Sequence, residues 1–224
     1  MKNYKKNLEI LRKNHVYSEE MEHDACGVGL IASTEGKKSR KIVEYGIEAL
    51  KAVWHRGAVD ADGKTGDGAG IHVEIPKDFF IEKVEVTGHT YDNSEICVGM
   101  IFLPRNDYAA QENCKTIVES ELTKNDFSIY GWRQVPVNPK VLGEKAFQTM
   151  PEIIQVLFKS NNPELLNKDL ERKIYETRRI IENKAFQISL NNFYICSLSS
   201  KSIIYKGMFL AEAISEFFLD LKDE

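Results

Sequence analysis

Apolar residues recur along the chain in two patterns, as short continuous runs and as longer stretches at helical spacing. Short apolar runs between polar segments predict buried strands, and we expect these at residues 26–32, 71–75, 95–103, 127–137 and 151–160. Apolar residues at a period near that of the α-helix predict helices, and we expect these at residues 39–54, 106–124, 163–186 and 210–219. Residues 192–200 and 201–208 alternate and adjoin closely, which indicates a β-hairpin.

The order of these elements favours an α+β fold. Several hairpin-like strands are separated by long helices, which is typical of stacked layers rather than of a doubly wound parallel sheet. An apolar content of 42% in 224 residues suffices for one sizeable core. The chain shows no repeat, low-complexity tract or linker, so we expect one domain. The charged lead-in at residues 1–25 has little apolar surface with which to dock.

Charge and hydropathy restrict the partners and the compartment. The net charge is only −4 with 29% charged residues, which gives no electrostatic case for nucleic acid or a membrane surface. No apolar stretch approaches the roughly 18 residues of a transmembrane helix. The N-terminus is polar and lacks the apolar core of a secretory signal. We therefore expect a cytoplasmic protein.

The four cysteines lie far apart, and their spacing argues against a disulfide framework or a metal site. Cys97 and Cys196 fall in apolar runs and are expected to be small core residues, and Cys114 falls in a helical pattern and is expected to be inert. Cys26 differs, because it opens an apolar run with two nearby glycines that give close backbone access to its sulfur.

A cut between Ala25 and Cys26 would give Cys26 a free α-amine beside its thiol. An α-amine titrates near roughly 7.7–8.0 and a thiol near about 8.5, so the amine could accept the thiol proton at neutral pH. On the residues alone, a structural cysteine is the commoner alternative. His55 could also pair with Cys26, but only the presence of both residues supports that pair.

The polar, glycine-rich stretch at residues 55–70 is the second candidate. Its glycines suit positive φ or close backbone approach. A phosphate-binding loop would need its first glycine one position later than Gly57, and a strand rather than a helix before it. Its three aspartates lack the spacing of a calcium loop and are expected to be solvated turn residues; these are Asp60, Asp62 and Asp67.

Three motifs together carry a resemblance to a known family, namely EHDACGVGLIA, EALKAVWHRGAVDADGKTGDGAG and IPKDFF. They resemble the class II glutamine amidotransferase domain at the start of the glutamate synthase large subunit. The similarity continues in the same order through GWRQVPV, PEIIQVLFKS and FYICSLSSKSIIYKGMFLAE, over residues 22–213.

The resemblance implies a four-layer αββα sandwich of the N-terminal-nucleophile hydrolases, incomplete at its C-terminus. Residues 1–25 would be a propeptide-like lead-in and residues 26–224 a partial amidotransferase domain. Cys26 would become residue one and act as nucleophile and, through its amine, as base. Arg56 would organise the surroundings of the cysteine with its fixed donors. A turn at Thr65 to Gly70 would shape the adjacent loop.

The implied reaction is the hydrolysis of glutamine to glutamate and ammonia through a cysteinyl thioester. The ammonia would react with 2-oxoglutarate in later domains that carry FMN and an iron–sulfur cluster, with no cofactor in this chain. The implied partners are glutamine and the remaining glutamate synthase domains, or a piece encoded downstream, with no nucleic acid and no membrane.

One departure from the family favours an alternative. The family's glutamine-gripping arginine motif and its oxyanion Asn-Gly pair do not occur before Glu224. Since the loss of one oxyanion donor costs about 10²–10³ in rate, we expect little activity from the chain alone. The alternative is a truncated or docking module without catalysis. A different N-terminal-nucleophile amidotransferase is disfavoured by the GWRQVPV and YICSLSSKSIIYKGM segments.

Overall fold

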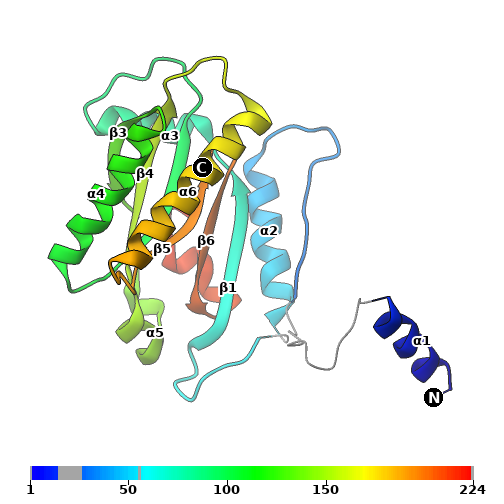
Figure 1. Ribbon diagram of the computed structural model, residues 1–224. Helices are drawn as coiled ribbons and strands as arrows, with labels where there is room; N and C mark the ends of the chain where they lie inside the picture. The colour runs from blue at the N-terminus through cyan, green and yellow to red at the C-terminus, as the bar shows by residue number, and fades with distance from the viewer. Residues whose placement is uncertain (1, 15–26, 55–56, 223–224) are drawn as a thin grey trace.

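Two antiparallel sheets organise the computed structural model, which describes residues 2–14, 27–54 and 57–222 (Figure 1). Within these residues the larger sheet has the order β3-β4-β2-β5 and the smaller one pairs β1 with β6. The strands are β1 (Thr65–Glu74), β2 (Cys97–Leu103), β3 (Phe127–Gln134), β4 (Glu152–Ser160), β5 (Tyr194–Ser199) and β6 (Ser202–Phe209). The predicted α+β class is confirmed.

The helices are α1 (Lys2–Lys13), α2 (Arg40–Ala52), α3 (Lys77–Val86), α4 (Tyr108–Lys124), α5 (Glu144–Thr149), α6 (Asn167–Gln187) and α7 (Ile214–Phe217). The predicted helices at 39–54, 106–124 and 163–186 are confirmed as α2, α4 and α6. The side chain of Ser39 caps α2 and that of Asp107 caps α4, each accepting a hydrogen bond from a backbone amide of the first turn. The helices α3 and α5 were not predicted.

Two apolar cores lie on the two faces of the larger sheet. Helices α4 and α6 cover one face, where Phe158 and Val118 are fully buried. The opposite face packs against α2, α3, α7 and the inner side of β1 and β6, around residues such as Phe80 and Phe218. Successive side chains of a strand point to opposite faces. The continuous apolar runs of β2 and β4 therefore serve both cores.

The strand predicted at residues 26–32 is wrong for the part that the structure describes. Residues 27–33 belong to no helix or strand, and Val28 and Leu30 are 91% and 89% exposed. No described strand pairs with this segment. Without a hydrogen-bonded ladder, nothing directs its alternating apolar side chains to one buried face.

The predicted turn at Thr65–Gly70 is also wrong, because these residues form the first part of β1. A Cβ atom on Gly66 would lie 2.7 Å from the carbonyl oxygen of Phe209 in β6. One on Gly70 would lie 2.9 Å from the Cβ of Lys206. The pairing shifts its register between Thr65 and Ala69. These glycines therefore permit a close approach of two backbones rather than a reversal of the chain.

The predicted hairpin of residues 192–208 is wrong, because β5 pairs with β2 while β6 pairs with β1. Hydrogen bonds of serine residues take the place of backbone hydrogen bonds between β5 and β6. Ser197 Oγ accepts a hydrogen bond from the amide of Ile204 at 3.2 Å. Glu171 of α6 accepts hydrogen bonds from the amide of Ser200 at 2.7 Å and from Ser199 Oγ at 2.9 Å. The chain can therefore change sheets at this corner with its amides satisfied.

The predicted helix at residues 210–219 is broken. The chain forms a 3₁₀ turn at Ala211–Ala213, the short α7 and a second 3₁₀ turn at Leu219–Lys222. Between them Phe218 is fully buried and extended, and it bridges Val137. Burial of this ring and the bridge outweigh the local helical preference.

A buried ion pair fastens this C-terminal segment to both sheets. The Asp220 side chain, 5% exposed, accepts two hydrogen bonds from the Arg133 guanidinium in β3, at 2.6 and 2.8 Å. Arg133 also donates to Gln155 Oε1 of β4 at 2.8 Å. Tyr205 of β6 donates to Asp220 at 3.3 Å. One carboxylate thus joins residues from three elements.

The Asp220→Ala variant should therefore lose much stability. Removing one partner leaves the Arg133 charge uncompensated and poorly hydrated, which costs about 3–5 kcal/mol. Urea unfolding measures this loss. Glu216→Ala removes an exposed carboxylate paired with Lys222 and should change the unfolding midpoint little. Equal effects of the two substitutions would contradict this account.

Candidate active site

The two predicted catalytic residues, Cys26 and Arg56, lie outside the described residues, as does His55. The segments that flank them in the chain are described. Residues 27–38 and α2 run in opposite directions, so the start of this segment and the C-terminal end of α2 face the same side of the molecule (Figure 1). Trp54, which follows α2, is 64% exposed.

The residues that follow Arg56 fold back onto β1. Val59 bridges Gly66, and the Asp60 amide donates to the Thr65 carbonyl at 2.8 Å. Asp67 donates its amide to the Ala58 carbonyl at 3.2 Å. Residues 57–65 therefore form a tight loop whose two arms are hydrogen-bonded to each other.

Asp62 closes this loop from within. One carboxylate oxygen accepts the amides of Lys64 at 2.9 Å and of Thr65 at 2.7 Å, and the other accepts the Thr65 hydroxyl at 2.6 Å. The hydroxyl and amide hydrogen bonds of Thr65, followed by that of Lys64, lower the pKa of Asp62 well below its usual range. The carboxylate is therefore ionised at neutral pH.

The same two side chains reach α5, about eighty residues later in the chain. The Lys145 amide donates to Asp62 Oδ2 at 3.5 Å, and the Ala146 amide donates to Thr65 Oγ1 at 3.3 Å. A Cβ on Gly143 would lie 2.3 Å from Asp62 Oδ2, so only glycine fits there. We call this set, Asp62 and Thr65 with Gly143 and the amides of residues 145 and 146, the α5 clasp.

A second contact supports the clasp. Lys145 Nζ pairs with Asp60 Oδ2 at 2.6 Å, and this hydrogen bond lowers the pKa of Asp60. Asp62 is exposed and lies in a turn, so the prediction of a solvated turn residue is confirmed for it. The side chains of Asp60 and Asp62 in addition make the contacts with α5 described above, which the prediction did not include. Asp67 makes no side-chain hydrogen bond or ion pair within the described part of the chain.

The clasp was not predicted, although the hydrogen bonds between Asp62 and Thr65 have a recognisable pattern in the sequence. An aspartate that accepts amides two and three residues later is a common turn arrangement, and Asp62 and Thr65 have that spacing. The other half is α5, whose six residues are too few for a reliable periodic pattern.

The other three cysteines are buried, which confirms their predicted structural character. Burial raises the pKa of Cys114 and of Cys196 to about 11. It raises the pKa of Cys97 further still. These thiols are thus protonated at neutral pH and poor nucleophiles.

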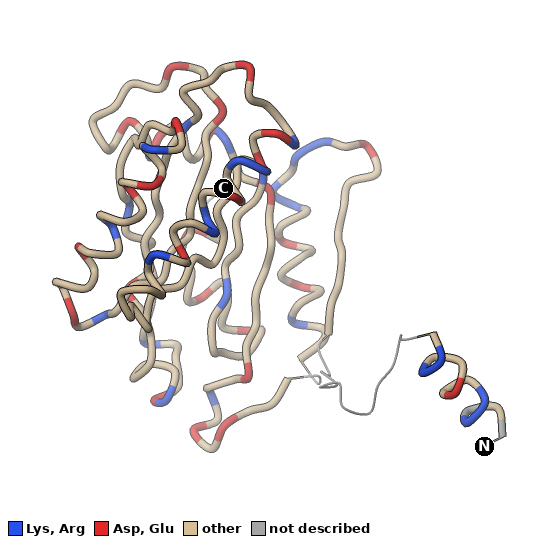
Figure 2. The backbone as a smooth tube through the Cα atoms, in the orientation of Figure 1, with Lys and Arg blue, Asp and Glu red and all other residues tan. Residues whose placement is uncertain are grey.

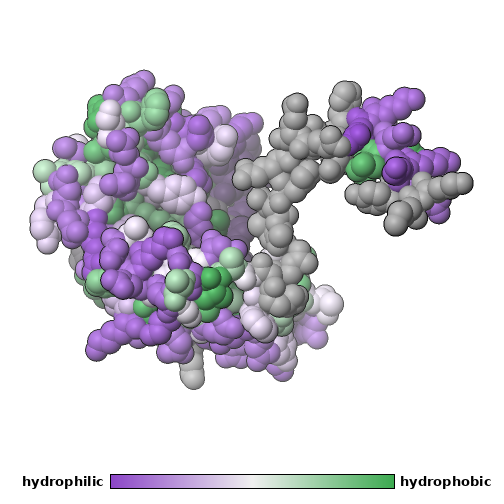
Figure 3. Space-filling model, turned by 90° about the horizontal axis from the view of Figure 1, so that it is seen from below, coloured by the Kyte–Doolittle hydropathy of each residue, from purple (hydrophilic) through white to green (hydrophobic). Residues whose placement is uncertain are grey.

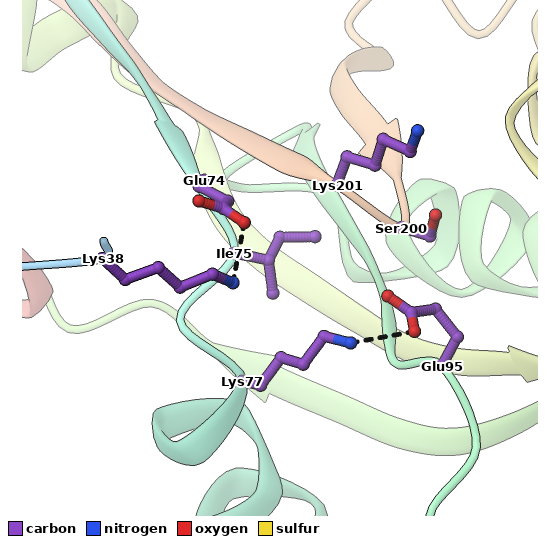
Figure 4. A pocket seen from close by; sticks show the side chains of 7 residues that line it. All are labelled: Lys38, Glu74, Ile75, Lys77, Glu95, Ser200 and Lys201. Carbon is purple, nitrogen blue, oxygen red and sulfur yellow. Dashed lines mark hydrogen bonds and ion pairs between the residues drawn. The ribbon is translucent and has the colours of Figure 1, made fainter. Parts of the chain in front are cut away.

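A hollow of about 450 Å³ lies at the far end of β1 from the clasp (Figure 4). Its lining residues are Lys38, Glu74, Ile75, Lys77, Glu95, Ser200 and Lys201. Two ion pairs span it, Lys38–Glu74 at 2.7 Å and Lys77–Glu95 at 2.9 Å. The length of β1 separates this hollow from the loop that follows Arg56.

Surface charge and exposed apolar residues are dispersed over the described parts of the faces that the figures show. Basic and acidic residues alternate along α4 and α6 (Figure 2), and from below apolar residues form small separate patches (Figure 3). Among the described residues, no three His, Cys, Asp or Glu side chains gather as a metal site would require. No helix of the described part combines the length and apolarity needed to cross a membrane.

A protein-family model described as glutamine amidotransferases class-II matches residues 26–224, so the match begins at Cys26. This chain is a class II glutamine amidotransferase domain. The family membership predicted from the motifs is confirmed.

Named relatives place the domain within glutamate synthases. The chain is 53% identical over 221 residues to the glutamate synthase [NADPH] large chain of Azospirillum brasilense, covering 99% of this chain and 14% of that protein. It is 40% identical over 205 residues to ferredoxin-dependent glutamate synthase 1 of Arabidopsis thaliana, covering 91% and 12%. It is 38% identical over 204 residues to the Synechocystis ferredoxin-dependent glutamate synthase 2, covering 90% and 13%. The chain thus spans a small part of each relative's length.

The buried thiols should resist alkylation in the folded domain. Because neutral pH lies far below their pKa values, Cys97, Cys114 and Cys196 should stay unmodified by iodoacetamide in native protein and react once it is unfolded. Peptide mass spectrometry distinguishes the sites. Modification of any of the three at the native stage would contradict the described burial.

The carboxylate of Asp62 should titrate below the ordinary value of about 3.9. Because its folded-state pKa is lowered, Asp62 stabilises the fold above its unfolded-state pKa, and this contribution disappears as the pH falls through the folded-state value. Carboxyl-carbon NMR measures the midpoint. A midpoint at or above the ordinary value would show that the hydrogen bonds of the clasp do not form.

Proposed function

We propose that this chain carries the glutaminase site of a glutamate synthase and hydrolyses the side-chain amide of glutamine to glutamate and ammonia. The observation that carries the proposal is the division among its four cysteines. Three are buried and protonated, and the fourth, Cys26, stands where the family match begins.

The proposed chemistry uses both the thiol and the α-amine of Cys26. After residues 1–25 are removed, the free α-amine accepts the thiol proton and the sulfur attacks the amide carbon of glutamine. The C–N bond breaks, and ammonia leaves with the proton held by the amine. Water then attacks the glutamyl thioester, which releases glutamate and restores the thiol. Nucleophile and base reside in one residue.

Arg56 is the proposed supporting residue. Its planar guanidinium offers several donors in a fixed geometry, which suits the ordering of polar groups around the nucleophile. Support comes from its position between the end of α2 and the loop 57–65, which the α5 clasp holds. The glutamine clamp and the oxyanion donors are not assigned to residues of this chain.

The proposal also includes a four-layer fold for this domain and the use of the released ammonia by other domains. The two antiparallel sheets and the layer of α4 and α6 support a four-layer αββα arrangement of the N-terminal-nucleophile type. The relatives are named glutamate synthases, and we propose that the ammonia is delivered to 2-oxoglutarate outside this chain. We assign FMN and the iron–sulfur cluster to other glutamate synthase domains, and no step in this chain depends on them.

The glutamine analogue 6-diazo-5-oxo-L-norleucine tests the proposal directly. In the full-length protein it should alkylate Cys26, with protection by excess glutamine, because the reagent occupies the glutamine site. Cys26→Ala should lower glutamine hydrolysis by at least ~10³-fold, since the nucleophile is lost. Cys114→Ala should leave hydrolysis intact.

Two outcomes would overturn the assignment. Labelling of another cysteine would show that the nucleophile is not Cys26. Absence of labelling and of hydrolysis in the processed wild-type protein would instead favour the docking-module alternative.

A further inference from the structure

We propose that Asp62 and Thr65 are positioning residues for glutamine hydrolysis, because the α5 clasp fixes the loop 57–65 that follows Arg56 in the chain. This inference rests on the proposed function, since it assigns a role to residues beside the proposed site. The partner of that loop is α5, a helix that neither the motifs nor the proposed chemistry involves.

The Thr65 hydroxyl is the central atom of the clasp. It donates to Asp62 Oδ2 at 2.6 Å and accepts from the Ala146 amide at 3.3 Å, and the residue is 2% exposed. It is thus hydrogen-bonded on one side to the loop and on the other to α5. Gly143, which has no room for a Cβ, brings α5 close enough for both contacts.

Backbone hydrogen bonds to β1 and the clasp, rather than the apolar core, hold this loop. Its one large apolar side chain, Val59, is 52% exposed, and the remaining residues between Gly57 and Lys64 are small or polar. Backbone hydrogen bonds join residues 58–60 to the start of β1. Within the described residues, the hydrogen bonds and the ion pair at Asp60, Asp62 and Thr65 connect the loop to α5.

The clasp lies close to Arg56 along the chain. Gly57, the next residue, donates its amide to the Trp54 carbonyl at 3.0 Å. An added Cβ on Gly57 would lie only 3.3 Å from Asp67 Oδ1 of β1, so this part of the loop also packs tightly. A shift of the loop would therefore move the peptide that carries Arg56. Misplacement of a catalytic group by about 1 Å can cost ~10²-fold in rate.

A matched pair of substitutions isolates the hydroxyl. Thr65→Val keeps the volume and the strand preference and removes the donor and acceptor, whereas Thr65→Ser keeps the hydroxyl. In the processed full-length protein, Thr65→Val should lower kcat for glutamine hydrolysis roughly 10–100-fold. Thr65→Ser should restore a rate near that of the wild type.

Asp62→Asn tests the other half of the clasp. The amide cannot accept the Thr65 hydroxyl and the loop amides as the charged carboxylate does, so kcat should fall in the same direction. Asp78→Asn removes an exposed carboxylate in the first turn of α3 and should have no effect. A merely structural role would predict losses of activity only in proportion to losses of thermal stability.

Hydrogen exchange of the loop amides distinguishes failure of the clasp from failure of the function. Thr65→Val and Asp62→Asn should speed exchange at residues 57–66 and leave β2 and β4 protected. Faster loop exchange with unchanged kcat would overturn the positioning role and leave the glutaminase proposal standing. Unchanged exchange would show that the clasp does not hold the loop. A processed wild-type protein without glutamine hydrolysis would overturn both proposals.

Discussion

The close approach of β1 and β6 is the constraint on which the proposed site depends. The two backbones meet where Gly66 and Gly70 carry no Cβ, and a side chain at either position would overlap β6. This pairing fixes Thr65 at the start of β1, with its hydroxyl aimed at the loop and at α5. The geometry of the loop after Arg56 therefore depends on glycines that lie beyond it in the sequence.

Burial makes three of the four thiols of the chain chemically inert. The cores on the two faces of the larger sheet enclose Cys97, Cys114 and Cys196, where desolvation keeps them neutral. A cysteine protease or amidotransferase needs a thiolate at working pH. The packing of the described residues thus excludes three of four candidates, and the family match supports the fourth.

The periodic elements could be predicted from the sequence, because their patterns are long and agree with their packing. The helices α2, α4 and α6 present one apolar face each, and β2 and β4 are buried on both faces. The elements that were predicted wrongly depend on contacts between segments that are distant in the sequence. Glycines in β1 suggested a turn but serve a close approach, serines let β5 and β6 part into different sheets, and the burial of Phe218 breaks the last helix.

The candidate site was predictable only in part. Cys26 and Arg56 came from the resemblance, since neither periodicity nor spacing distinguishes a catalytic cysteine from a structural one. The turn closed by Asp62 had a local signature. Its contact with α5 had none, because the two segments lie about eighty residues apart and the contact depends on backbone amides.

In the proposed mechanism one residue, Cys26, supplies both the attacking sulfur and the amine that deprotonates it. Intact-mass and N-terminal analysis of the active protein tests this most directly. We expect a mature chain that begins at Cys26 with an unblocked amine. Full glutamine hydrolysis by protein that retains residues 1–25 would contradict it.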